Sequence, residues 1–183
     1  KITISGCGLR EGAMFRYAVP GINERPLSDV LGHSLYTQMR YHDLNIAHAE
    51  HVYNLSIQLF KQLKVLHKMP RVYVRVLKIA ALMHDSGMRI KFYNHQLHSA
   101  YIILNSNLYG VPHKDIVVAA FVAAGHRKAE NARDEIVKYK DMLTQEDVDA
   151  IRKLSVILRI AESLTVRKAV WIRASIATCS VTA

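Results

Sequence analysis

Glycine and proline gather in the first 26 residues, and after Ser28 apolar residues recur at the spacing of an α-helix. This pattern predicts six helices, over residues 28–40, 44–67, 71–84, 95–106, 114–126 and 145–165. The fifth segment (IVVAAFVAAGH) is apolar on nearly all sides, so that helix is expected at the centre of the fold. Thr144, with Asp147 three residues later, is a variant capping box that marks the start of the last helix. The chain is therefore predicted to be mainly α.

Both ends of the chain have a different pattern. The segment KITISGC at 1–7 and the β-branched segment that follows Lys168 predict short strands. The first residue is lysine, and the chain both begins and ends within a strand-like segment, without a terminal helix or tail. The chain is therefore expected to be a piece of a longer protein.

Composition restricts the setting of the domain. No apolar run approaches the roughly 18 to 20 residues that a membrane span needs, and no signal-peptide pattern opens the chain. The two cysteines, Cys7 and Cys179, form no paired motif. These features predict a reducing, cytoplasmic compartment and no membrane partner.

The net charge of +10 predicts an anionic partner. The excess is local, because Lys61 to Lys91 contains eight basic residues and one acid. Within it, a stripe at helical spacing consists of Arg71, Arg75 and Lys78. This basic stripe is either a solvated helix face or a surface for a polyanion such as polyphosphate or nucleic acid.

A histidine-aspartate pair, His84-Asp85, ends the third predicted helix. His84 continues the apolar row of Tyr73 and Leu77, opposite the basic stripe, so it is expected to face inward. The same phasing places two more polar side chains in apolar rows of other helices, namely His48 and Glu162. A buried carboxylate is costly unless it is paired, protonated or bound to metal.

A more ordinary interpretation stands beside this one. A single histidine on an apolar face is usually a hydrogen-bonded core residue, and Glu162 could pair with Arg127 or Arg159. Histidine is also common in this chain, as shown by His33, His42, His67, His95 and His113. Three inward polar residues on three helices nevertheless favour a shared divalent-metal site suited to phosphate chemistry.

Longer strings point to a family. The order of His48, His84-Asp85, later histidines and a late acid is similar to the HD phosphohydrolase pattern. GLREG (8–12), HSAYIILNSNLYG (98–110), HRK (126–128) and RIAESL (159–164) resemble the exopolyphosphatase/guanosine-pentaphosphate phosphatase (Ppx/GppA) family. The resemblance implies that 1–26 is the tail of an actin-like phosphatase domain with a linker. It implies an HD-domain-like helical bundle at 27–168, and the strand-like residues 169–183 are expected to be the start of a further, truncated segment.

The resemblance also implies roles for individual residues. The metal ligands would be His48, His84 and Asp85, with Glu162 replacing the late aspartate of the superfamily and Mg²⁺ or Mn²⁺ as the ion. Asp85 is the implied catalytic residue, and a second ion could be held by His98 and His126. The expected polyanion-binding residues are Arg71, Arg75, Lys78, Arg127 and Lys128.

Three functions follow from these expectations. The first is an accessory domain of an exopolyphosphatase whose main active site lies in the preceding actin-like domain. It would bind polyphosphate or a phosphorylated guanosine nucleotide and could supply a homodimer contact. The second is an autonomous metal-dependent phosphohydrolase acting on nucleotides. The third is a non-catalytic scaffold or dimerisation domain.

Overall fold

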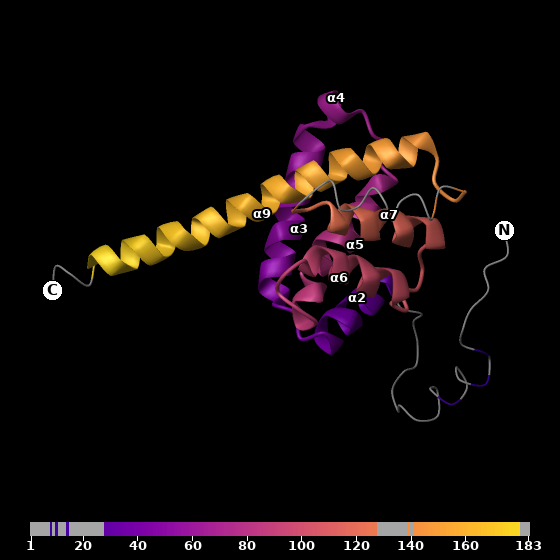
Figure 1. The fold of residues 1–183 in the computed structure, drawn as a ribbon, viewed down its shortest axis with the longest axis horizontal. Coiled ribbons are helices and arrows are strands. Elements are labelled where there is room, and N and C mark those ends of the chain that lie inside the picture. Colours follow the sequence, from indigo (N-terminus) through magenta and orange to yellow (C-terminus); the bar gives the residue numbers. More distant parts are fainter. Residues whose placement is uncertain are drawn as a thin grey trace. The chain divides into compact units, whose positions relative to one another are not determined.

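The computed structural model describes residues 28–127 and 141–179, together with Gly8, Arg10, Met14 and Tyr139; side chains are described up to Thr165 (Figure 1). The chain divides into two compact units, Lys1–Val30 and Leu31–Ala183. The strand predicted at 1–7 lies outside the described residues. The described helices belong to the second unit, apart from Val30 at the start of the first one.

The mainly helical class is confirmed, and every predicted helix has a counterpart. Residues 28–127 and 141–179 form helices and turns, without a strand. The predicted helix at 44–67 divides at Leu63, where the backbone N–H still bonds to Leu59 before a short new helix begins. The elements are α2 (Val30–Tyr41), α3 (Ile46–Gln62), α4 (Lys64–His67), α5 (Tyr73–Met83), the 3₁₀ helix η1 (Ser86–Arg89), α6 (His95–Asn105), α7 (His113–Ala124) and α9 (Gln145–Cys179).

The core is built around α5 and α7. In α7 every side chain from Ile116 to Ala124 is buried, which confirms the central position predicted for this apolar segment. α5 packs between α3 and α7, and α7 also packs against α6 and α9 (Figure 1). α9 also packs against α3, and both α5 and α7 contact α9. The site described below lies where these helices meet.

The start of α9 is fixed by the predicted capping box. The N–H and the hydroxyl of Thr144 donate to Asp147 Oδ2 at 2.8 and 2.7 Å, and Asp147 N–H donates back to Thr144 Oγ1 at 3.3 Å. The same buried carboxylate accepts the Tyr73 hydroxyl at 3.1 Å and pairs with Lys114 Nζ at 2.7 Å. Asp147 therefore ties α9 to α5 and α7 as well as capping its own helix.

The strand predicted over 169–183 is wrong for the part that the structure describes. α9 continues through this segment to Cys179. Extending a helix needs no new nucleus, and each β-branched residue weakens a helix by only a fraction of a kcal/mol. Three alanines and an arginine in 169–179 favour the helical state further. Among the described residues, no helix has both the length and the apolar character of a membrane span.

Candidate metal centre

His48 is positioned by the first turn of α3. The Asn45 side chain caps this helix by accepting the backbone N–H of His48 at 3.0 Å. The cap places His48 on the turn that faces the end of α5, with 26% of its side chain exposed. Its ring centroid lies 5.5 Å from that of His84.

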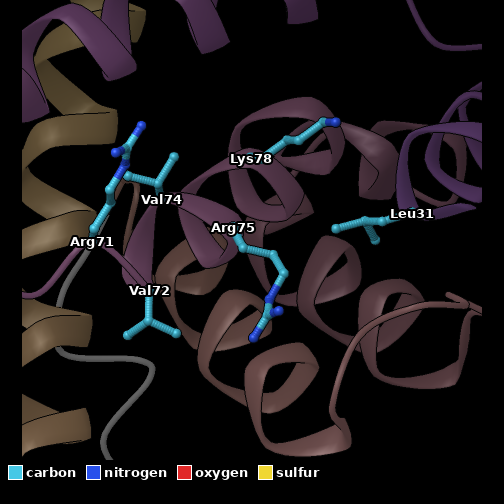
Figure 2. A pocket seen from close by; sticks show the side chains of 6 residues that line it. All are labelled: Leu31, Arg71, Val72, Val74, Arg75 and Lys78. Carbon is cyan, nitrogen blue, oxygen red and sulfur yellow. The ribbon is translucent and has the colours of Figure 1, made fainter. Parts of the chain in front are cut away.

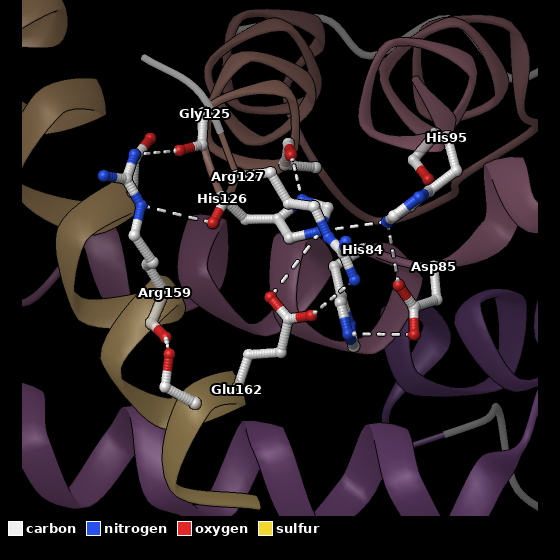
Figure 3. Close-up of polar contacts among 12 residues, drawn as sticks. His84, Asp85, His95, Gly125, His126, Arg127, Arg159 and Glu162 are labelled. Atoms are coloured by element: carbon white, nitrogen blue, oxygen red, sulfur yellow. Dashed lines mark hydrogen bonds and ion pairs between the residues drawn. The ribbon is translucent and has the colours of Figure 1, made fainter. Parts of the chain in front are cut away.

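The end of α5 delivers the next two residues. His84 is fully buried, and Asp85 follows where α5 gives way to η1. The two carboxylate oxygens of Asp85 point to different partners. Oδ2 lies 3.3 Å from His84 Nε2 and 3.6 Å from His48 Nε2, whereas Oδ1 lies 3.4 Å from His95 Nε2. Figure 3 shows that His95 and His84 contact different oxygens of this carboxylate.

Three imidazoles of the cluster are held in the same way. Each lies within hydrogen-bond distance, through Nδ1, of the backbone carbonyl oxygen three residues earlier. The contacts are His84 to Ala81 at 2.8 Å, His95 to Phe92 at 2.9 Å and His126 to Ala123 at 2.5 Å. A carbonyl oxygen only accepts, so in the neutral form of each ring Nδ1 carries the proton and Nε2 has a lone pair for a ligand. This arrangement is typical of metal-binding histidines.

Two sets of three ligand atoms result, and they share Asp85. Within each set all atoms lie within 4.8 Å of one another, which suits one ion per set; the sets are His48, His84, Asp85 and Asp85, His95, His126. The Nε2 atoms of His95 and His126 lie 3.3 Å apart. Two unprotonated nitrogens at this distance repel each other unless a cation or a proton lies between them.

Buried atoms without partners support the same interpretation. His84 Nε2 and Asp85 Oδ1 are inaccessible to solvent and have no hydrogen-bond partner of good geometry. The 3.3 Å contact of His84 with Asp85 brings the two groups together without the angles of a hydrogen bond. Unpartnered buried polar atoms are costly, and a divalent cation would satisfy both. The residues present therefore fit a metal ion.

Glu162 reaches the edge of the cluster from α9. Its side chain is 13% exposed, with Oε2 3.7 Å from His126 Nε2 and Oε1 3.5 Å from Arg127 Nη2 (Figure 3). Nearby, Arg159 donates to the carbonyl oxygens of Gly125 at 2.8 Å and His126 at 3.3 Å. Arg159 thus caps α7 where it delivers His126, and Glu162 has the ion pair with Arg127 that its burial requires.

The charges in the cluster are strongly coupled. Burial alone would raise the pKa of Asp85, but the neighbouring His84 outweighs it and lowers this pKa to about 2. Burial likewise acts to lower the pKa of His84, yet the Asp85 carboxylate raises it above its usual value. Burial, and then repulsion from His84, lower the pKa of His126 to about 3. Burial also lowers the pKa of His48. His48 and His126 are therefore neutral and able to bind metal at neutral pH.

The structure brings together five of the six residues expected at the site: His48, His84, Asp85, His126 and Glu162. Glu162 lies beside the two ligand sets without belonging to either. His98 belongs to neither set, and His95 takes the place expected for it. Helical phasing gives only a weak signal of this difference, because His95 leads to the buried Ser99, whereas His98 leads both to the exposed Tyr101 and to the buried Ile102.

The basic stripe lies away from the cluster. Arg71, Arg75 and Lys78 line a surface hollow of about 410 Å³ together with apolar side chains that include Leu31 (Figure 2). Arg75 is already paired with the Asp115 carboxylate through Nε, at 2.8 Å, and through Nη2. Of the two remaining basic residues expected to bind a polyanion, Arg127 is paired with Glu162, and Lys128 lies outside the described residues.

Comparison with known proteins agrees with the resemblance in the sequence. Residues 33–181 match the family described as Ppx/GppA phosphatase, domain III. Two curated relatives are named guanosine-5'-triphosphate,3'-diphosphate pyrophosphatase, from Aeromonas hydrophila subsp. hydrophila and Aeromonas salmonicida. Each is 31% identical over 172 residues, which cover 91% of this chain. The chain spans about a third (32%) of the length of these relatives. The helical domain that carries the histidine cluster therefore belongs to the Ppx/GppA phosphatase family, as its domain III.

Proposed function

We propose that this chain is the metal-binding domain III of a phosphohydrolase that cleaves phosphoric anhydrides, and that it hydrolyses a phosphate ester or anhydride at its own histidine-aspartate cluster. The observation that carries the proposal is the sharing of Asp85 by two complete sets of ligand atoms. Many enzymes that hydrolyse phosphate esters, such as phosphatases and nucleases, use two divalent ions in one site. The names of the relatives support a phosphorylated guanosine nucleotide as substrate of the full-length protein.

The donor set favours one kind of ion. Mg²⁺ prefers an all-oxygen shell, so of the two ions expected from the sequence the four imidazoles favour Mn²⁺, and they also suit Fe²⁺ or Zn²⁺. Bound at this cluster, divalent ions neutralise charge on a phosphate and make water a nucleophile near neutral pH. His48 and His84 would hold one ion, His95 and His126 the other, and Asp85 would contact both.

The remaining residues have supporting roles in this proposal. Asp85 orients the reacting groups through the two oxygens that it directs at the two histidine pairs. Glu162 keeps Arg127 beside His126, where the guanidinium offers positive charge to a phosphate oxygen. Arg159 holds the end of α7, and with it the ring of His126, in position.

A metal titration of matched variants tests this proposal. The wild-type chain should bind two equivalents of Mn²⁺, measured by electron paramagnetic resonance, and hydrolyse members of a nucleotide panel. His84→Ala and His95→Ala should each lose one equivalent and most of the activity. His98→Ala, three residues further along α6, should change neither. Binding that is equally sensitive at positions 95 and 98, or no binding by the wild type, would refute the metal centre.

The hollow beside the basic stripe favours a second function, in which the same domain binds a polyanion such as polyphosphate for the full-length enzyme. Arg75 already pairs with Asp115, and Lys78 also has an interaction within the chain, so Arg71 is the residue to test first. Polyphosphate affinity should fall with rising salt and weaken in Arg71→Gln, whereas Arg152→Gln on α9 serves as an exposed control. Equal losses in both variants would count against a specific surface.

The rest of the proposal concerns the full-length protein. We place the principal phosphatase site in a preceding actin-like domain, to which residues 1–26 would connect. The helical bundle is proposed to be of HD type, because the shared aspartate and its histidines follow the order of that pattern. A cytoplasmic homodimer is the proposed working form, and sedimentation of the full-length protein would test that stoichiometry.

A further inference from the structure

A pocket of about 260 Å³ opens onto the first ligand set. Its lining combines residues of that ligand set, apolar side chains and one positively charged guanidinium group. The residues that matter are His48, His84, Asp85, Leu44, Met88 and Arg89. Pockets that enclose drug-sized ligands measure roughly 300 to 1,000 Å³. This pocket is smaller, so it can enclose one end of a nucleotide but not the whole molecule.

Arg89 is the strongly basic side chain of this pocket. It follows Asp85 by one turn of η1, and the Met88 N–H that precedes it bonds to the Asp85 carbonyl at 3.0 Å. Its Nη1 lies 3.4 Å from Asp43 Oδ2, and the two side chains are 62% and 76% exposed. Water screens both charges of such an exposed pair, so it adds little stability and exchanges readily for a better partner. A phosphate offers a guanidinium two parallel hydrogen bonds.

Asp43 stands in an unusual backbone conformation. It follows α2 with a φ of 50°, in the left-handed region where a helix commonly ends in glycine or asparagine. Aspartate tolerates this region less well than glycine. Its carboxylate therefore stands at a position where the fold does not require one, on the rim of the pocket and opposite Arg89. Backbone strain of this kind often accompanies a functional site.

We propose that this pocket is the substrate subsite of the metal centre and that Arg89 binds the terminal phosphoryl group of the substrate. Arg89 pairs with Asp43 when the pocket has no ligand, and it exchanges Asp43 for the phosphate when a substrate binds. The substrate class is a molecule with an accessible phosphoryl end, whose remaining part stays outside the pocket. This inference rests on the proposed metal centre, because Asp43 and Asp85 would otherwise repel an anion.

The test is calorimetric titration of the full chain, first with Mn²⁺ and then, in the Mn²⁺-loaded protein, with inorganic phosphate. Arg89→Gln should weaken phosphate binding by about tenfold to a hundredfold, as expected for a lost charged hydrogen bond, without changing Mn²⁺ affinity. Asp43→Asn keeps a residue suited to left-handed backbone and removes the competing charge, so it should strengthen phosphate binding. Lys91→Gln, on the same exposed segment, is the matched control and should bind phosphate like the wild type.

The outcomes separate the two proposals. Absence of Mn²⁺ binding in the wild type overturns both of them. Normal Mn²⁺ binding with equal phosphate affinity in Arg89→Gln and Lys91→Gln overturns the subsite and leaves the metal centre standing. Tripolyphosphate and guanosine 5'-monophosphate, titrated in parallel, should depend on Arg89 alike. Binding of the nucleotide that is more than about tenfold tighter than that of tripolyphosphate would overturn the assignment to a phosphoryl end alone.

Discussion

Replacing Asp85 by asparagine should change both the stability of the metal-free domain and its response to metal. The His84 side chain lowers the pKa of Asp85, against the effect of burial, from an ordinary value of 3.8 to about 2. That difference corresponds to about 2 kcal/mol of unfolding free energy, which the neutral amide would lose. The carboxylate is only 21% exposed, so little of this value is lost to solvent screening.

The sign of the effect depends on pH. A depressed carboxyl pKa stabilises the fold above pH 3.8, and this contribution is lost as the pH falls through about 2. His84 has a raised pKa, so its share is present below 6.5 and is lost as the pH rises through the raised value. The two shares describe one coupled pair and count once. The cost of Asp85→Asn should therefore be greatest in mildly acidic solution and decline in alkaline solution.

Urea unfolding over a pH series from about 5 to about 10, without metal and with Mn²⁺, measures both effects. Wild type should gain about 2.7 kcal/mol for each Mn²⁺ site when free Mn²⁺ is a hundred times the dissociation constant of that site, and Asp85→Asn should gain almost nothing. Asp149→Asn, an exposed change on α9, provides the control. A pH-independent cost, or a full Mn²⁺ response in Asp85→Asn, would refute the reasoning.

Three further variants test other parts of the structure. In Gly87→Ala the new Cβ would lie 2.0 Å from the carbonyl oxygen of His95, so urea unfolding should show a loss of about 3 kcal/mol or more. Tyr73→Phe removes one hydrogen bond from Asp147, whose other partners remain, and should lower unfolding free energy by about 1 kcal/mol. In the wild type, ultraviolet difference spectra should show a tyrosine with a pKa near 12, absent from this variant, because burial and Asp147 raise the pKa of Tyr73 to about 12. Arg159→Met removes two hydrogen bonds to carbonyl oxygens at the end of α7; a loss of about 1 to 3 kcal/mol in thermal unfolding, with weaker Mn²⁺ binding, is expected, and unchanged values would contradict the capping role.

The helices were predictable because their signals are local. Apolar spacing and the capping box at Thr144 act within a few turns of the chain, and the structure contains the helices and the cap that they predict. The course of α9 beyond Lys168 is not predictable in the same way, because the β-branched residues of this segment favour a strand locally and the helix that precedes them decides the outcome. An existing helix lowers the cost of adding further turns, and this context outweighs a weak strand preference.

The site was only partly predictable. Phasing along single helices indicates that His48, His84 and Glu162 face inward, and the structure places them beside one another. In the sequence His95 has no feature that separates it from the other histidines, whereas its neighbour His98 lies in the string that resembles the family. The pairing of elements distant in sequence, such as η1 with the turn after α2, leaves no periodic signal at all. Roles in metal binding stay predictions for every one of these residues.

The repeated bond from Nδ1 to a carbonyl three residues earlier has a consequence for how the site tolerates change. The orientation of each of these imidazoles is fixed by its own backbone turn and not by its neighbours in the cluster. Replacing one of these histidines therefore leaves the other rings in their orientation, so metal binding should weaken in steps as single histidines are replaced. Asp85 differs, because its carboxylate belongs to both ligand sets and its replacement affects both at once. The cluster should thus tolerate the loss of a single histidine better than the loss of its aspartate.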